Sequence, residues 1–219
     1  MTGTRTYNAR RGRMRTGRLD ALTRLGPVFG VPDGPVDRVA LFGRRAPLVL
    51  EIGSGMGDAT VAMAAADPDR DYLAVEVHTA GVANLLVLLE SSELDNVRVV
   101  HGDAMALVRD RLAPASLDAI HVFFPDPWPK ARHQKRRLIQ PSWVALMTDR
   151  LVPGGLLHCA TDAADYAEQM LAVLSGEAAL ANVHSRFAPR PAHRPDTRYE
   201  ERGRAAGRAS FDLLFRKIP

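Results

Sequence analysis

Hydrophobic positions along the chain form short apolar runs that alternate with longer segments of helical spacing. Seven runs have the length of strands, at residues 47–52, 71–77, 97–101, 117–124, 156–160, 182–187 and 210–217. The segments between them predict helices at residues 33–43, 58–66, 80–90, 104–112, 138–151 and 162–174. The early strands are apolar at successive positions, which is typical of a parallel sheet buried on both faces. The sequence therefore predicts an α/β fold with a mostly parallel, seven-stranded sheet and helices on both faces.

A glycine-rich turn follows the first predicted strand, where an α/β sheet of this kind binds its ligand. Residues 48–60 (LVLEIGSGMGDAT) include Gly53 and Gly55, and glycine permits a tight turn and close approach of backbone to ligand. A dinucleotide-binding loop would place glycine at position 58, where Asp58 stands, and this argues against a dehydrogenase. Glu51 disfavours a pyrophosphate nearby and suits a cationic ligand.

Acidic residues also end the next two strands. Glu76 is placed to accept hydrogen bonds from both hydroxyls of a ribose, a device that dehydrogenases share. Asp103 can accept from an adenine amino group, although a single aspartate in a turn more often has a structural role. The spacing therefore favours a ligand that contains a nucleoside.

The segment after the fourth strand, residues 123–137 (FFPDPWPKARHQKRR), carries the strongest signal for chemistry. Two prolines flank Asp126 and fix the backbone of its turn, so this carboxylate is expected to face the reactive end of the ligand. Trp128 suits either stacking on a base or filling a hydrophobic turn. The basic side chains that follow are candidates for contacts with nucleic-acid phosphates: Lys130, Arg132, Lys135, Arg136 and Arg137.

Charge is strongly segregated, although the formal net charge is only +4. The windows 1–18, 130–137 and 186–208 hold 18 of the 29 basic residues and three of the 25 acidic ones, a net of +15. The rest of the chain has a net charge of −11. This distribution favours a polyanionic partner, and the alternative is three solvated loops without a common role.

The N-terminus is predicted to be a flexible basic arm over residues 1–30, ahead of one folded domain over residues 31–219. Residues 1–18 contain six arginines and no acid, and a mitochondrial transit peptide is the alternative interpretation. Cys159 is the only cysteine, which excludes an internal disulfide and a cysteine-rich metal cluster. We expect a cytoplasmic protein with no membrane segment and no metal site, whose oligomeric state the sequence does not determine.

Six stretches together resemble the bacterial tRNA (guanine-N7)-methyltransferase family: LEIGSGMG, AVEVH, GDA, FPDPWPKARHQKRRL, ATDAADYAEQM and RPDTRYEERG. They run from residue 50 to the C-terminus and leave residues 1–30 outside the resemblance. The resemblance implies a Rossmann-like class I methyltransferase fold, S-adenosylmethionine as cofactor, and tRNA as partner, with N7 of guanine 46 in the variable loop as the target.

The resemblance also implies roles for individual residues. Asp126 is the catalytic position. The implied cofactor contacts are Glu51, Gly53, Gly55, Glu76, Asp103 and Asp126, and the implied substrate contacts are Lys130, Asp162, Thr197, Arg198, Tyr199 and Glu200. Two positions depart from the family pattern: Ser54 replaces a frequent aromatic residue, and Arg198-Tyr199 replaces the usual Lys-Phe.

Guanine N7 has an in-plane lone pair and no proton to lose, so its methylation needs positioning and electrostatics more than a general base. Asp126 is expected to hold the guanine edge and stabilise the growing positive charge, with Asp162 and Glu200 helping from neighbouring loops. Two rival functions remain. A methyltransferase acting on exocyclic amines would carry Asp/Asn-Pro-Pro-aromatic, and here the order is Pro-Asp-Pro-Trp. A non-catalytic RNA-binding protein would not bind the cofactor.

Overall fold

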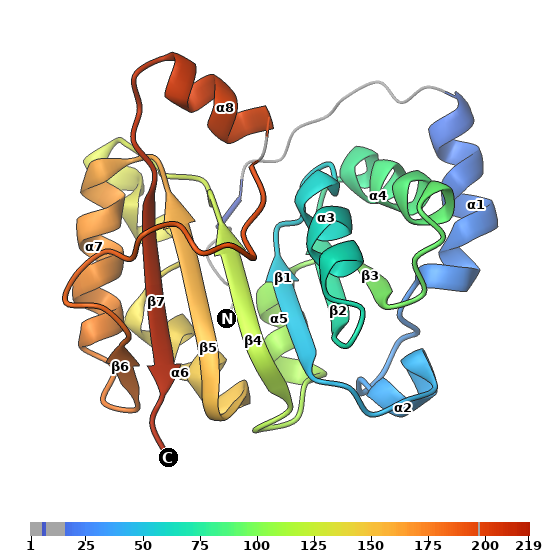
Figure 1. Cartoon of the computed structure of the whole chain (residues 1–219), viewed down its shortest axis with the longest axis horizontal. Helices are drawn as coiled ribbons and strands as arrows, with labels where there is room; N and C mark the ends of the chain where they lie inside the picture. Colours follow the sequence, from blue (N-terminus) through green and yellow to red (C-terminus); the bar gives the residue numbers. More distant parts are fainter. Residues whose placement is uncertain (1–5, 8–15, 197) are drawn as a thin grey trace.

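A computed structural model describes residues 6–7, 16–196 and 198–219, and a single seven-stranded sheet forms its centre (Figure 1). The strand order is β3-β2-β1-β4-β5-β7-β6, and only the pairings of β7 are antiparallel. The strands are β1 (Leu48–Ile52), β2 (Asp71–Glu76), β3 (Val97–His101), β4 (Leu117–Phe123), β5 (Leu151–Thr161), β6 (Leu180–Asn182) and β7 (Phe211–Lys217). The predicted class of fold is therefore confirmed.

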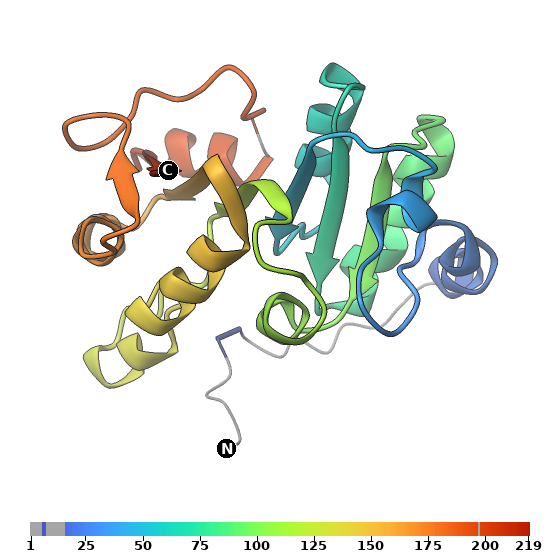
Figure 2. The same cartoon turned by 90° about the horizontal axis from the view of Figure 1, so that it is seen from below.

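Helices cover both faces of this sheet, which Figure 2 views from below. They are α1 (Thr16–Phe29), α2 (Arg38–Phe42), α3 (Asp58–Ala66), α4 (Thr79–Ser91), α5 (Ala104–Asp110), the 3₁₀ helix η1 (Ala131–Arg136), α6 (Pro141–Arg150), α7 (Ala164–Ser175) and α8 (Arg198–Ala205). None of the helices in the described part of the chain is both long and apolar enough to cross a membrane.

Two hydrophobic clusters explain why the early strands are apolar throughout. Leu48 and Leu50 of β1 belong to a cluster with buried residues of α5, α6 and α7. Val49, which lies between them, belongs to a second cluster with residues of α1, α3 and α4. Because successive side chains of a strand point to opposite faces, both faces of β1 are buried.

Residues 16–30 differ from the flexible arm that was predicted over residues 1–30. Helix α1 begins at Thr16 and packs on α4. Ala21 and Leu25, four residues apart, are 1% and 5% exposed. The backbone N–H of Val31 then donates to the carbonyl of Val99 in β3, at 3.1 Å. The apolar face of this helix is short and is flanked by basic residues in the sequence. The charge of the segment therefore hid its helical hydrophobic pattern. Residues 1–5 and 8–15 lie outside the described part.

Several element boundaries also differ. β5 begins at residue 151 instead of 156, and β6 spans Leu180–Asn182 instead of residues 182–187. The 3₁₀ helix η1 and helix α8 were not predicted, and α2 is shorter than residues 33–43. These pieces are short or strongly polar, and their own hydrophobic pattern is therefore weak.

The packing of α1 gives a first prediction. Leu25→Ala should lower the free energy of unfolding by about 2–3 kcal/mol, because it leaves a cavity between α1 and α4. Val28 is 59% exposed on the same helix, so Val28→Ala should change stability by less than about 0.5 kcal/mol. Urea denaturation of both variants measures the difference, and equal stability of the two would mean that α1 is not part of the folded domain.

Candidate active site

The glycine turn after β1 has a backbone that only glycine adopts readily. Gly53, Gly55 and Gly57 have φ angles of 80°, 59° and 87°. A Cβ on Gly57 would lie 2.7 Å from Cδ1 of Leu85 in α4, whereas a Cβ on Gly53 would meet no atom within 4 Å. Gly57 therefore lets α4 pack against the turn, and Gly53 leaves space open in front of it.

A pocket lies at the carboxyl ends of β1 to β4, as predicted for this type of sheet. The predicted site residues Gly53, Glu76, Asp103 and Asp126 all line it. Its apolar walls come from Ile52, Val75, Val77, Met105, Phe123 and Leu138, and Thr6 and Tyr7 of the N-terminal segment also reach it. Three carboxylates thus converge on an otherwise largely apolar pocket.

The Glu76 carboxylate holds the walls of the pocket together. One oxygen accepts a hydrogen bond from the backbone N–H of Gly55, at 2.8 Å, and the other accepts from the backbone N–H of His78, at 2.7 Å. Nδ1 of His78 lies 2.8 Å from the same oxygen. Glu76 is only 6% exposed, so it fixes the glycine turn against β2 before any ligand binds.

Asp103 has the structural role that a single aspartate in a turn commonly has, and it also lines the pocket. It is the N-cap of α5, where Oδ1 accepts from the backbone N–H groups of Met105 and Ala106 at 2.8 and 3.2 Å. This cap holds the carboxylate at the edge of the pocket in a fixed position.

Glu51 is not among the residues that line this pocket, and its role as a cofactor contact stays a prediction. It is 3% exposed, and the hydroxyl of Thr60 in α3 donates to its Oε2. Burial, together with the nearby negative charge of Glu76, raises the pKa of Glu51 to about 7 in spite of the Thr60 hydrogen bond. Glu51 is therefore a buried support of the site.

The turn that carries Asp126 is held between two strained residues. Phe124 and Trp128 have φ angles of 49° and 44°, in the left-handed region that residues other than glycine rarely adopt. Trp128 is 8% exposed, its Nε1 donates to the carbonyl of Thr6 at 3.1 Å, and the guanidinium of Arg136 lies 5.0 Å from its ring. Of the two roles considered for Trp128, the structure favours the hydrophobic anchor of the turn.

Arg137 is not available for contacts with a nucleic acid, which corrects its prediction as an RNA-binding residue. Its side chain is 2% exposed and donates to the carbonyl of Pro127 at 2.8 Å and to Oε1 of Gln169 at 2.6 Å. It also forms an ion pair with Asp165 and stacks over the ring of Tyr166. Arg137 thus anchors the segment after Asp126 to α7.

The remaining basic residues of this segment lie on the surface. Lys130, Arg132 and Lys135 are exposed in and next to η1, directly after the Asp126 turn, and Arg136 is half-buried against Trp128. These side chains place positive charge directly after the turn whose Asp126 lines the pocket.

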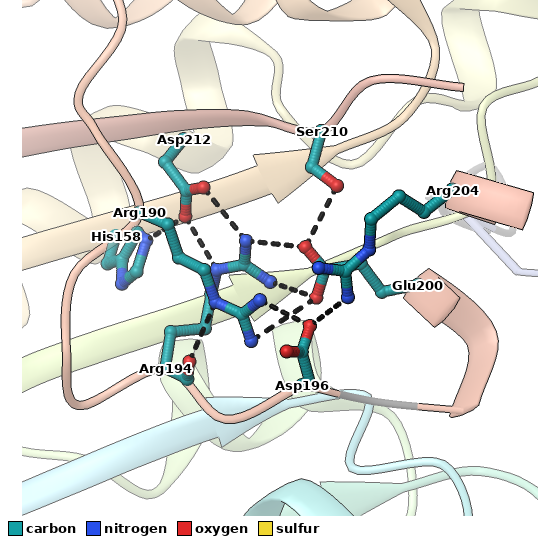
Figure 3. A network of polar contacts seen from close by, with 8 residues as sticks. All are labelled: His158, Arg190, Arg194, Asp196, Glu200, Arg204, Ser210 and Asp212. Atoms are coloured by element: carbon teal, nitrogen blue, oxygen red, sulfur yellow. Dashed lines mark hydrogen bonds and ion pairs between the residues drawn. The ribbon is translucent and has the colours of Figure 1, made fainter. Parts of the chain in front are cut away.

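The third basic window, by contrast, is largely neutralised by ion pairs (Figure 3). Arg194 is buried and paired with Glu200 and Asp212, and Asp196 pairs with two further arginines. The two arginines that pair with Asp196 are Arg190 and Arg204. Two more pairs are Arg208–Asp162 and Arg186–Glu168. Counting charges along the sequence therefore overestimated the positive charge that this window can offer to a partner.

The predicted substrate contacts of the C-terminal half have mixed positions. Asp162 is half-buried at the end of β5 and accepts from Nε of Arg208 at 2.8 Å. Glu200 is 5% exposed and accepts from both terminal nitrogens of Arg194 and from the Ser210 hydroxyl. Thr197 and the side chains of Arg198 and Tyr199 lie outside what the structure describes.

Comparison with known proteins agrees with this architecture. A family model described as a putative methyltransferase matches residues 45–213. The solved 16S rRNA methyltransferase KamB superimposes with a TM-score of 0.57 at 17% identity, covering 82% of this chain and 92% of that one. TrmN from Thermus thermophilus gives a TM-score of 0.55 at 16% identity, covering 82% of this chain and 47% of that one. The fold and the family model define a Rossmann-like methyltransferase.

Curated relatives narrow the family. Proteins named tRNA (guanine-N(7)-)-methyltransferase are 53% identical in Streptomyces coelicolor and 50% identical in Bordetella pertussis. The alignments cover 98% and 99% of this chain and 81% and 86% of those relatives. The chain belongs to the tRNA (guanine-N(7)-)-methyltransferase family. The similarity also extends into residues 1–30, which the sequence motifs alone had left outside it.

The raised pKa of Glu51 predicts a pH-dependent stability. The unfolded chain releases this proton near the ordinary value of 4.5 and the folded chain only near 7, so the free energy of unfolding falls as the pH rises through this window. Glu51→Gln keeps an acceptor for Thr60 and removes the titration. As the pH rises from 5 to 8, the free energy of unfolding of the wild type should fall by about 2–3 kcal/mol relative to that of the variant.

Thermal unfolding at several pH values measures this gain. The exposed Glu201→Gln in α8 serves as the control and should follow the wild-type profile. Parallel profiles of Glu51→Gln and wild type would mean that Glu51 ionises normally in the folded protein.

The burial of Arg137 predicts a second stability effect. Arg137→Ala should lower the free energy of unfolding by about 2 kcal/mol or more, because buried acceptors lose their donor. The exposed Arg132→Ala should cost less than about 0.5 kcal/mol. The two variants are compared by urea denaturation, and an Arg137→Ala variant as stable as Arg132→Ala would restore Arg137 to the candidates for RNA contact.

Proposed function

We propose that this methyltransferase transfers the methyl group of S-adenosylmethionine to N7 of guanine 46 in the variable loop of tRNA, in the cytoplasm. The observation that carries the proposal is the convergence of Glu76, Asp103 and Asp126 on one pocket, with Lys130 and Arg132 exposed beside it. The names of relatives at 50–53% identity support the choice of tRNA and of guanine N7. The position 46 rests on the resemblance of the motifs.

The residues present suit S-adenosylmethionine. Gly53 has an open side where a Cβ would fill the pocket, and its neighbouring walls are apolar, as an adenine ring requires. Glu76 can accept from ribose hydroxyls with the lone pairs that Gly55 and His78 leave, and Asp103 can accept from the adenine amino group. When bound, S-adenosylmethionine supplies a methyl group on a positively charged sulfur, and the three carboxylates of the pocket suit that charge.

Asp126 is proposed as the catalytic residue. The strained Phe124 and the buried Trp128 on either side hold its turn in place, so its carboxylate is preorganised before substrate binds. A carboxylate accepts hydrogen bonds from the N1–H and amino group of guanine, and its charge stabilises the cation that forms on methylation. Guanine N7 carries its own lone pair, so no side chain has to remove a proton from it.

The proposed tRNA contacts divide into two groups. Lys130, Arg132 and Lys135 offer positive charge to phosphates next to the pocket, and Arg136 contributes from its position on Trp128. We propose that Thr197, Arg198, Tyr199 and Asp162 contact the substrate, in line with the family resemblance. Glu200 has both oxygens engaged by Arg194, so we assign it to positioning the 190–200 segment.

The decisive variant is Asp126→Asn, which keeps the shape of the side chain and removes its charge. Turnover on unmodified tRNA should fall by about a hundredfold or more, the loss expected for one preorganised electrostatic contact, while folding and tRNA affinity are retained. Digestion of the tRNA and mass spectrometry of the nucleosides measure the product, which should be 7-methylguanosine for the wild type.

The control is Asp110→Asn at the far end of α5, where the carboxylate is exposed and paired with Arg109. It should behave as the wild type. Normal turnover by Asp126→Asn would make Asp126 structural. Methylation of adenine or of an exocyclic amine by the wild type would overturn the proposed reaction, and cofactor-free tRNA binding without any product would favour the non-catalytic alternative.

A further inference from the structure

Three histidines that sequence spacing did not connect lie together on one face of the sheet. His121 of β4 and His158 of β5 are register partners on adjacent parallel strands. His193 comes from the segment before α8, which crosses in front of these strands in Figure 1. One ring nitrogen from each of the three lies within 4.8 Å of the others. None of the three lines the pocket that holds Asp126.

Hydrogen bonding sets the protonation of the central histidine. Nε2 of His158 lies 2.7 Å from Oδ1 of Asp212, and Arg194 donates to the other oxygen of that carboxylate at 2.9 Å (Figure 3). An ionised carboxylate only accepts, so His158 carries its proton on Nε2 and keeps the lone pair on Nδ1. Nδ1 lies 3.1 Å from Nε2 of His193. A carboxylate behind a histidine in this way is the usual outer partner of a metal-ligating imidazole.

The other two histidines are also prepared to act as ligands. His121 is 4% exposed, and its Nδ1 has no hydrogen-bond partner within the described structure. Such a buried, unsatisfied nitrogen is costly, and each one requires an explanation. Burial, with the neighbouring His158, lowers the pKa of His121, and burial likewise lowers the pKa values of His158 and His193. Burial therefore favours the neutral form of each imidazole, and neutral imidazole is the form that binds metal.

The positive side chains around the cluster are compensated. Arg194 is paired with Glu200 and Asp212, and Arg70 is paired with Asp67 at 2.9 Å. A cation at the three histidines would therefore not face an unbalanced charge. His121 and His193 also border a cavity on this face of the sheet, from which a water molecule can reach the cluster.

We propose that His121, His158 and His193 bind one divalent transition-metal ion of the zinc type, with a water molecule as the fourth ligand. Imidazole nitrogens suit such ions, and tetrahedral coordination at 2.0–2.1 Å places two ligand nitrogens about 3.3 Å apart. The His158–His193 pair is already at 3.1 Å. His193 is exposed, so its side chain is free to rotate toward the two buried histidines.

The position of the site suggests a structural role. The ion would tie the segment around His193 to β4 and β5, and the same segment carries Arg194, which holds Glu200. Metal binding thus fixes the segment that precedes α8, and the ion does not contact the reacting atoms. The binding itself is independent of the proposed methyl transfer, so failure of either proposal is recognised separately.

The test uses the full chain without a histidine tag, stripped with a chelator and titrated with Zn²⁺ by calorimetry and with Co²⁺ by visible spectroscopy. We expect one ion per chain, Co²⁺ absorption typical of four-coordinate sites, and a rise in melting temperature on Zn²⁺ addition. His193→Ala should weaken binding by more than the roughly 10- to 100-fold seen when an outer-shell partner is lost. The rise in melting temperature should disappear with it.

Two further variants make the result specific. His193→Cys should retain binding and give the Co²⁺ complex a thiolate charge-transfer band in the near ultraviolet. His184→Ala, outside the cluster, should bind as the wild type. Circular dichroism in chelator confirms that each variant folds. Absence of saturable one-to-one binding, or unchanged affinity in folded His193→Ala, or a His193→Cys complex without a thiolate band, would overturn the proposed site.

Discussion

The close contact between the glycine turn and helix α4 is the constraint on which the site depends. Gly57 leaves no room for a side chain against Leu85, and a Cβ on Gly81 would lie 2.2 Å from the carbonyl oxygen of Gly55. Because α4 packs this closely, Glu76, which precedes α4 at the end of β2, can accept a hydrogen bond from the backbone N–H of Gly55 in the turn. The loops after β1, β2 and β3 are thereby joined into one rigid wall, because Gly102 also donates to the Glu76 carbonyl at 3.0 Å.

Much of the positive charge in the C-terminal half serves the fold. Arg137 and Arg194 are buried in polar networks that anchor the segments following β4 and β6. Each arginine satisfies polar partners inside its network. Removing one member of such a network leaves its partners unsatisfied. These two arginines are therefore poor candidates for contacts with RNA. The exposed charge next to the pocket is instead concentrated at Lys130, Arg132 and Lys135.

The antiparallel strand β7 gives the molecule its second polar centre. By pairing with β5 it places Asp212 opposite Ala160 in the carboxyl half of that strand, within reach of His158. The segment before α8 then folds back over β5 and β4, and its Arg194 closes on the same carboxylate. The candidate metal site and the segment that carries the proposed substrate contacts are therefore parts of one network.

The sequence by itself determined the order of the main strands and helices, the glycine turn, and the acids at the ends of β2, β3 and β4, because these depend on local pattern and on the fixed geometry of parallel sheets. It did not determine which polar side chains are buried. Arg137 has the same sequence character as Arg132, yet Gln169 and Asp165 of α7 hold it in a buried position. The histidine cluster required the β4–β5 register, and helix α1 required the apolar face of α4, because both are contacts between residues far apart in the chain.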